Sequence, residues 1–500
     1  MRSRSVVEIT SPQAFDALGT ALPNGLYDPA LGPYESKESA PCITCGNLYL
    51  NCPGHSGHIE LCVPVYQPLV FPDMVKLLRI KCLACHSFRI SQKEALMFQV
   101  KLALLDTGRW KEALELDSQL ASLTQQVSLG VKEEGGSEPL TRQGKEELQN
   151  RVKKSAFDLL RSKMVSITKS THRNVTLNSH ERSERRIIIK EFFKLCGSKK
   201  KCSNCGAFSP RLRQDASNKI FQCPLSNKNR SINRAENIKI RSAAIGFIGG
   251  AEETDEWASD DSDLDDDSDS DSDADLFANE PEGESTMTDD EDDGKDPFKN
   301  KSRESTVQTR KKPTSAQSKA AESTVRPDKF MHAFEIEAQV KSTWRKDPLL
   351  CSQIFGCAHS SQTNMDEEGY DGSSFFFMRV IAVPPSRFRP PMVMGTMTVE
   401  HAQNHYLNKI LELNDRLRIL LATVQKLEAG VASVDEAATD KPTKDEMENI
   451  QARSLSTWID LQTTVNCFID SSKDPSAAAS NNVPNGIRQL LEKKEGIFRK

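Results

Sequence analysis

The chain has 500 residues, of which 37% are hydrophobic and 27% are charged, and its formal net charge is −5. This length allows two or three domains, but the composition is too polar for one compact globule. The apolar runs fall short of the roughly 18 residues that a membrane-spanning helix needs, so we predict no membrane partner. The 13 cysteines, several of them in Cys-x-x-Cys pairs, indicate a reduced intracellular protein whose thiolates bind metal.

The net charge conceals two segments of opposite sign. Residues 251–294 hold 22 Asp and Glu and no Lys or Arg. Without that segment, 66 basic residues stand against 49 acidic ones, so the remainder is basic, as expected of a phosphate-binding protein. Residues 151–241 alone hold 23 Lys and Arg and 6 Asp and Glu. This block is either a nucleic-acid surface or an insertion that its charge keeps soluble, and composition favours neither.

The N-terminal half begins with turns and continues as helices. Residues 25–33 read GLYDPALGP, which is dense in turn-forming residues. A helix is predicted just before the second cysteine pair by four apolar residues with helical spacing, Val70, Met74, Leu77 and Leu78. Residues 91–165 are predicted to be mostly helical, with a break near residues 135–139.

Residues 250–327 are predicted to be a disordered insertion, acidic at first and then basic. Such a polar segment cannot offset the entropy of folding by burying apolar side chains. Order is predicted to resume near Phe330. The dense apolar run at residues 375–383 predicts a buried strand, which leads into the proline-rich segment VPPSRFRPP at 383–391.

Two long helices are predicted after the proline-rich segment. The first has a coiled-coil seam with steps of three and four, formed by Ile410, Leu413, Leu417, Leu420, Val424 and Leu427. The second carries Met447, Ile450, Leu461, Val465 and Phe468. A small, polar break at residues 430–442 separates them, which predicts an antiparallel helical hairpin. The expected fold class is α+β and multi-module, with small β elements, helices and this hairpin around zinc-stapled segments.

The first candidate metal site lies in the segment CITCGNLYLNCPGHSGHIE at residues 42–60. Its ligands are predicted to be Cys42, Cys45, Cys52 and His55, because two pairs with x-x spacing supply the four ligands of tetrahedral zinc with little loop entropy. His58 is the competing ligand, but its spacing from Cys52 does not match a knuckle. We expect His58 to form a local hydrogen bond instead.

The second candidate metal site joins two distant half-sites. Cys82 and Cys85 form one Cys-x-x-Cys pair, and Cys202 and Cys205 form another after 116 intervening residues. Since each pair offers two ligands and zinc takes four, we expect the two pairs to share one ion. The alternative ligands are Cys196, His86 and Cys223. Both sites would be closed by four protein ligands, so we predict two structural zinc ions and no catalytic residue. A third group, Cys351, Cys357 and His359, lacks knuckle spacing.

The motifs resemble the opening of the largest subunit of multisubunit DNA-directed RNA polymerases. GLYDPALGP precedes CPGHSGHIEL at 52–61, and VPPSRFRPP, a helical hairpin and KKEGIFRK at 493–500 follow in the order of that family. The form of GLYDPALGP and RFRPP, together with the acidic insertion, is most similar to RNA polymerase I. The resemblance implies five regions: 1–249, the clamp core and head with two zinc sites; 250–327, the insertion; 328–398, the return to the clamp and the lid region; 399–470, the clamp helical hairpin; and 471–500, the rudder and the start of a switch segment.

The resemblance also implies contacts with nucleic acid. Arg387 and Arg389 flank Phe388 in the lid region. There the guanidinium groups would bind phosphate and the ring would stack on a base. The alternative is a proline-stiffened turn with solvated arginines. The switch segment would contact template phosphates through Lys493, Lys494, Arg499 and Lys500, which composition alone assigns to a solvated helix face.

The family's magnesium-binding Asn-Ala-Asp-Phe-Asp-Gly-Asp loop is absent from these 500 residues. The resemblance therefore implies an N-terminal portion of a longer subunit, inactive alone, with magnesium held elsewhere in the full subunit. The implied partners are template DNA, nascent RNA, the second-largest and other polymerase subunits, and initiation factors at the hairpin, in the nucleus and nucleolus. The alternative function is a free-standing zinc-binding protein that interacts with chromatin or nucleic acid.

Overall fold

The computed structural model describes residues 2–16, 19–34, 41–134, 142–169, 178–238, 240, 328–356, 372–394, 397–432, 444–475 and 484–492. Helices dominate these residues, and the strands form three small sheets, so the fold is a mixture of helices and small sheets. Within the described residues, no helix is long and apolar enough to span a bilayer. The predicted insertion at 250–327 lies outside them.

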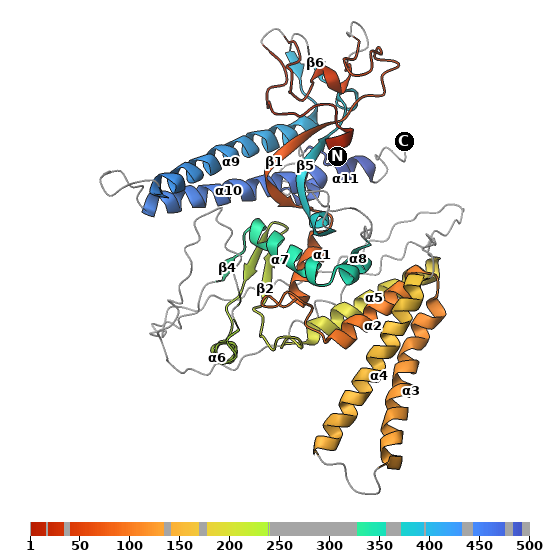
Figure 1. Cartoon of the computed structure of the whole chain (residues 1–500). Helices are drawn as coiled ribbons and strands as arrows, with labels where there is room; N and C mark the ends of the chain where they lie inside the picture. Colours follow the sequence, from red (N-terminus) through yellow and green to blue (C-terminus); the bar gives the residue numbers. More distant parts are fainter. Residues whose placement is uncertain are drawn as a thin grey trace, which may run out of the picture.

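A two-stranded antiparallel sheet lies at the centre of the fold (Figure 1). It consists of β1 (Gly57–Tyr66) and β5 (Phe377–Val383), and the register pairs Gly57 with Val383 and Tyr66 with Phe377. The strand predicted at 375–383 is shorter than expected, because its first residues belong to the 3-10 helix η4 (Gly372–Phe376). Burial in β5 also alternates, so one face of this strand is not in the core.

The helical first half forms an arm and its base. The base consists of α1 (Phe71–Ile80), α2 (Gln92–Asp106) and α5 (Ser179–Ser198), and α3 (Trp110–Glu134) and α4 (Arg142–Lys169) form the arm. Figure 1 shows α3 and α4 side by side, projecting away from the central sheet. Helix α2 starts at a capping box in which Ser91 and Glu94 exchange backbone hydrogen bonds, which explains why the helix begins there.

A second small sheet joins segments from either side of residues 241–327. Its strands are β2 (Leu212–Asp215), β3 (Lys219–Gln222) and β4 (Lys329–Phe330), and β4 pairs with β3. Helix α6 (Asn227–Ala235) precedes residues 241–327, and α7 (Ala333–Lys346) and α8 (Pro348–Phe355) follow them. After residues 241–327 the chain therefore re-enters the same sheet at β4, close to Phe330, where order was predicted to resume.

Helices α9 (Ala402–Ala432) and α10 (Lys444–Ile469) lie side by side against the central sheet (Figure 1). The predicted seam on α9 is shifted at one position, since Leu421 is buried and Leu420 is half-buried. Ile410 and Leu411 are both buried, because α9 packs on β1 as well as on α10 and needs a wider apolar face than a coiled coil.

The remaining elements are short: η1 (Arg2–Arg4), η2 (Pro29–Leu31), η5 (Ser386–Phe388), β6 (Met392–Met394), β7 (Met397–Val399), η6 (Ser471–Lys473) and α11 (Ile487–Leu491). Strands β6 and β7 form the third sheet.

Buried amide side chains fasten α9 and α10 to β1. The Cys62 N–H donates to Asn414 Oδ1 and Asn414 Nδ2 donates to the Glu60 carbonyl, each at 2.9 Å. The Tyr66 N–H donates to Gln462 Oε1 at 2.7 Å, and Gln462 Nε2 donates to the Tyr66 carbonyl at 3.1 Å. These bonds flank the register shift between β1 and β5, where the strand backbone lacks its regular partner. They fix both helices against the central sheet.

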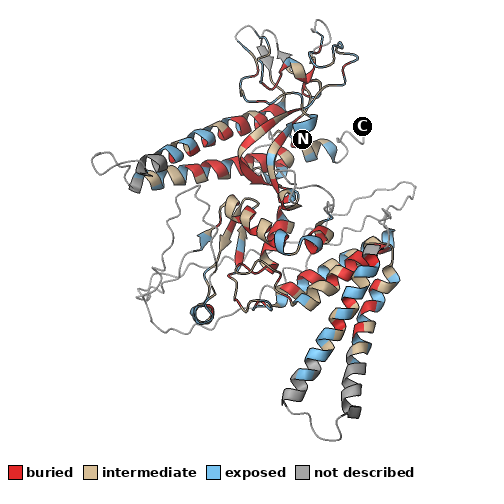
Figure 2. Cartoon of the chain, in the orientation of Figure 1, coloured by how far each residue is buried: buried red, intermediate tan, exposed pale blue. Residues whose placement is uncertain are grey.

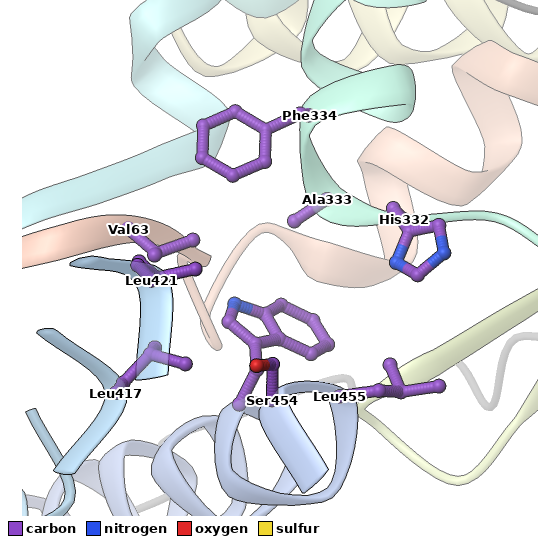
Figure 3. Close-up of a pocket in the computed structure, with 9 residues that line it drawn as sticks. Val63, His332, Ala333, Phe334, Leu417, Leu421, Ser454 and Leu455 are labelled. Carbon is purple, nitrogen blue, oxygen red and sulfur yellow. The ribbon is translucent and has the colours of Figure 1, made fainter. Parts of the chain in front are cut away.

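The core runs from the central sheet into the helices. Figure 2 shows buried residues along β1, β5 and the facing sides of α9 and α10, whereas much of the arm is exposed. A small pocket remains where α7 meets these elements. Figure 3 shows Val63 of β1, Phe334 of α7 and Leu421 of α9 converging on it. Its other lining residues are His332, Ala333, Leu417, Ser454, Leu455 and Trp458.

Candidate metal centres and proline-rich loop

The four predicted ligands of the first site lie together. The ligand atoms of Cys42, Cys45, Cys52 and His55 are all within 4.8 Å of one another. Cys45 Sγ lies 3.6 Å from Cys52 Sγ, and Cys52 Sγ lies 3.7 Å from His55 Nε2. A tetrahedral zinc ion with bonds of about 2.3 Å to sulfur separates its ligands by about 3.8 Å. We call this group cluster 1; its donor set and spacing fit zinc.

Two turns shape cluster 1. The Cys42 N–H donates to the Asn47 carbonyl at 2.9 Å, and the Gly46 N–H donates to the Cys42 carbonyl at 2.8 Å, which folds the Cys-x-x-Cys segment back on itself. Gly54, with φ +82°, lies beside the proline-rich loop, where an added Cβ would lie 2.7 Å from Pro385 Cβ. Only glycine fits there without displacement, which explains the Cys-Pro-Gly-His sequence.

The pKa values of Cys45 and Cys52 are shifted in opposite directions. The backbone N–H of Asn47 and the His55 ring lower the pKa of Cys45 to about 6. Burial raises the pKa of Cys52 to about 11. A bound zinc ion would favour the thiolate of both, since the metal ligand is the deprotonated form.

The competing histidine is not part of cluster 1. His58 lies in β1, and its Nδ1 is 2.7 Å from Ser5 Oγ, while its Nε2 is 3.6 Å from a Glu60 carboxylate oxygen. The hydrogen bond to Ser5 reaches across the fold rather than to a sequence neighbour, so the expectation of a local bond was wrong in that respect.

The two half-sites of the second candidate also lie together, and we call the group cluster 2. The sulfur atoms of Cys82, Cys85, Cys202 and Cys205 are within 4.8 Å of one another. Cys82 Sγ lies 3.6 Å from Cys205 Sγ, and Cys85 Sγ lies 3.7 Å from Cys202 Sγ. These separations match a tetrahedral zinc ion as well as those of cluster 1 do.

The three Cys-x-x-Cys segments adopt the same kind of backbone turn. The first cysteine N–H donates to the carbonyl five residues later, and the N–H four residues later returns a bond to the cysteine carbonyl, in the turns that begin at Cys42, Cys82 and Cys202. The residue after the second cysteine has positive φ each time: Gly46 (70°), His86 (62°) and Gly206 (76°). His86 therefore occupies the glycine position of its turn, outside the ligand group.

The other alternative ligands lie outside cluster 2. Cys196 is fully buried in the main core, and burial raises its pKa. Cys223 follows β3 and is half-buried, and it is not among the grouped sulfur atoms. Cys351 is buried in α8, while Cys357 and His359 lie outside the described residues.

Hydrogen bonds join the two halves of cluster 2. Asn204 Nδ2 donates to the Phe88 carbonyl at 3.0 Å and to the Ile90 carbonyl at 3.1 Å. The Ser203 N–H donates to the Arg89 carbonyl at 3.1 Å. Cluster 2 thus connects the end of α1 to the end of α5, two elements that are distant in the sequence.

A buried lysine connects cluster 2 to α7, the helix that begins at Ala333. Lys81 Nζ donates to the Gln339 carbonyl at 2.6 Å and to Gln339 Oε1 at 2.7 Å, and Gln339 belongs to α7. Burial lowers the pKa of Lys81 to about 7, although the negative charge of the neighbouring Cys82 thiolate opposes this shift.

In the proline-rich loop, Arg389 does not face solvent. Its side chain has no exposed surface, and its guanidinium donates to the Pro384 carbonyl (2.8 Å), the Leu26 carbonyl (2.9 Å) and Asn404 Oδ1 (2.5 Å). Burial lowers its pKa to about 10. Arg389 therefore joins three segments of the fold, and its predicted role as a nucleic-acid contact is wrong for this arrangement. One acceptor, the Leu26 carbonyl, is 363 residues away in the sequence, so no local pattern could have revealed it.

The two residues before Arg389 are more accessible. Arg387 is half-buried; it donates to the Cys52 carbonyl and lies 5.3 Å from the centre of the Tyr49 ring. Phe388 is 60% exposed. The loop thus rests on cluster 1 and presents an aromatic ring to solvent. The remaining predicted contacts, Lys493, Lys494, Arg499 and Lys500, lie outside the described residues.

Comparisons with known proteins agree with these motifs. Residues 1–246 match the family model described as RNA polymerase Rpb1, domain 1. The chain is 33% identical to DNA-directed RNA polymerase I subunit rpa1 of Schizosaccharomyces pombe, over 99% of this chain and 27% of that protein. This chain belongs to the family of RNA polymerase largest subunits. It is also 30% identical to subunit RPA190 of Saccharomyces cerevisiae, over 100% of this chain and 27% of that protein.

A shorter relative is matched over most of its own length. Subunit RPA1 of RNA polymerase I from Euplotoides octocarinatus is 26% identical, over 100% of this chain and 72% of that protein. The chain therefore corresponds to the N-terminal portion of an RNA polymerase I largest subunit. It spans 27% of each of the two yeast proteins.

Proposed function

We propose that this chain is the clamp portion of the largest subunit of a DNA-dependent RNA polymerase I, which synthesises the ribosomal RNA precursor from a DNA template. The observation that carries this proposal is the similarity to RNA polymerase I largest subunits along the whole chain. The nucleotidyl transfer itself would use magnesium bound elsewhere in the full subunit. This portion would hold DNA and RNA, in a nuclear and nucleolar complex with the second-largest and other subunits.

Two structural zinc ions would support this clamp. Cluster 1 and cluster 2 each offer four ligand atoms at tetrahedral spacing, which leaves no position for a reactive water. Cluster 1 would hold the segment before β1 and, through Arg387, the proline-rich loop. Cluster 2 would hold the base of the helical arm. Their role would therefore be to fix geometry rather than to perform chemistry.

The nucleic-acid contacts would lie on loops and helices beside cluster 1. The proline-rich loop would act as the lid, and the exposed ring of Phe388 is suited to stack on a base. Helices α9 and α10 would form the clamp helical hairpin that meets initiation factors, since their outer faces stay exposed while amides fix them to β1. Residues 471–500 would include the rudder and the start of the switch segment.

The proposal is tested in the cells that make this protein. Rapid depletion of the full subunit should stop synthesis of the ribosomal RNA precursor within minutes while messenger RNA synthesis continues, as pulse labelling would measure. Restoration with the unmodified subunit should recover synthesis and co-purify the second-largest subunit. Unchanged precursor synthesis after complete depletion would contradict the proposal.

The alternative function, a free-standing zinc-binding interaction protein, is not favoured, because the similarity to polymerase subunits extends across the whole chain. The same experiment separates the two. A chromatin adaptor would be recovered without other polymerase subunits, and its depletion would leave labelling of the ribosomal precursor intact.

A further inference from the structure

Helix α5 carries a ladder of four basic residues on one exposed face. Arg182, Arg186, Lys190 and Lys194 are spaced by four residues, and each is exposed. Residues four apart lie above one another on the same side of a helix. At 1.5 Å per residue the ladder extends over about 18 Å.

The ladder charges are unpaired within the described part of the chain, unlike those of their neighbours. Arg185 forms an ion pair with Asp106, and Lys199 Nζ lies 3.6 Å from a carboxylate oxygen of Glu94. No such pair forms at the four ladder residues. The ladder is therefore a local excess of positive charge that the fold does not neutralise.

The acidic residues of α5 reduce this excess little. Glu181 is buried and accepts a hydrogen bond from the Asn178 N–H at 2.9 Å, which caps the helix. Glu184 is half-buried, with a carboxylate oxygen 4.0 Å from His180 Nε2. Glu191 is exposed beside the ladder and removes at most one of its four charges.

The helix that carries the ladder is fixed in the fold. The opposite face of α5 buries Ile188, Phe192 and Phe193 in the core. Its C-terminal end leads within a few residues to the turn at Cys202, one ligand of cluster 2. The buried face and the C-terminal end of this helix are therefore held, and a ligand would bind there without ordering a loop.

We propose that the α5 ladder binds the phosphate backbone of double-stranded DNA, an inference that rests on the proposed function. Its length of about 18 Å spans about five phosphates along one strand, counted at 3.4 Å each. Binding to single strands usually adds aromatic side chains that stack on bases, whereas the exposed face of α5 offers the aliphatic Ile187. Contacts of this kind position a duplex without reading its sequence.

The test uses the complete polymerase and a duplex of non-promoter sequence. The fourfold variant R182Q/R186Q/K190Q/K194Q should bind at least tenfold more weakly at moderate salt. The slope of log affinity against log salt should become shallower by about two to four, since each lost phosphate contact removes about 0.9. The charge-conserving variant R182K/R186K should keep the slope. A matched control on α7, R345Q/K346Q, removes two exposed charges and should also keep it.

The outcomes separate this inference from the function it rests on. All four ladder residues are exposed, so zinc content and the melting temperature should be unchanged in every variant. Unchanged affinity and slope in the fourfold variant would overturn the inference while the unmodified polymerase still transcribes. Loss of a protein subunit instead of DNA affinity would also overturn it, in favour of an acidic protein partner. Failure of the unmodified polymerase to bind any duplex would contradict the proposed function itself.

Discussion

Clusters 1 and 2 have the same ligand spacing but hold the chain in different ways. Cluster 1 collects Cys42 to His55 from one continuous stretch, so its metal would order a local loop. Cluster 2 collects one pair from the end of α1 and the other from beyond α5, with the four helices α2 to α5 between them. Its metal would close a very long loop, which removes more freedom from the unfolded chain.

The surroundings of the two clusters differ as well. The loops at cluster 1 are also held without metal, since Arg387 and Ser386 donate to the carbonyls of Cys52 and Gly32. Cluster 2 forms a small core of its own around Cys82, Cys202 and Ala207, separate from the main core. The two clusters therefore have equal ligand geometry but should stabilise different amounts of the fold. Loss of cluster 2 should disturb more of it.

The largest effect is expected for Cys202→Ser. Loss of this ligand should release one zinc ion, leave three thiols without their metal and detach the end of α5 from α1, at a cost on the order of 4–5 kcal/mol. Thermal unfolding of the full chain and hydrogen exchange across α2 to α5 would measure it. Cys196→Ser is the matched control at a buried thiol outside the cluster and should keep both metals.

Cys45→Ser should have a smaller and more local effect. One zinc ion should again be lost, but destabilisation should stay near 2–3 kcal/mol, because the central sheet and α9 and α10 do not depend on the loop. Increased hydrogen exchange should be confined to residues 41–56 and to the proline-rich loop. Exchange that spreads into the helical arm would refute the distinction between the two clusters.

The grouping of the candidate ligands was predictable from their spacing and number. Cluster 1 could be predicted in full from ligand spacing, and cluster 2 because two half-sites imply a partner. Arg389 could not be predicted, since its acceptor Leu26 is 363 residues away in the sequence. Leu421 rather than Leu420 is buried, and it lines the small pocket with Val63 of β1 and Phe334 of α7, which a two-helix seam does not contain.

Arg389→Met tests whether the buried arginine joins three segments of the fold beside the loop that rests on cluster 1. The change keeps most of the side-chain volume but leaves the Pro384 and Leu26 carbonyls and Asn404 without their donor. We expect a loss of about 2–3 kcal/mol in unfolding free energy with zinc content unchanged. Arg387→Met, at the half-buried neighbour, should cost about 1 kcal/mol. Equal costs would show that the buried arginine does not join the three segments.

The smallest effect is expected at the turn glycines. Gly46→Ala and Gly206→Ala both place a side chain at positive φ, which costs about 1 kcal/mol. At Gly46 the added Cβ meets no atom within 4 Å, whereas at Gly206 it lies 2.9 Å from Glu236 Oε2. Gly206→Ala should therefore be slightly more destabilising, as chemical denaturation would measure. A neutral result at both sites would contradict the shared turn.

The zinc content of the purified chain tests the central claim most directly. Metal analysis by mass spectrometry should give about two zinc ions per unmodified chain, since each cluster supplies four ligands. Cys45→Ser and Cys202→Ser should each give about one, and the double variant none. A single zinc ion that persists unchanged in Cys202→Ser would contradict the claim that the distant cysteine pairs form one metal centre.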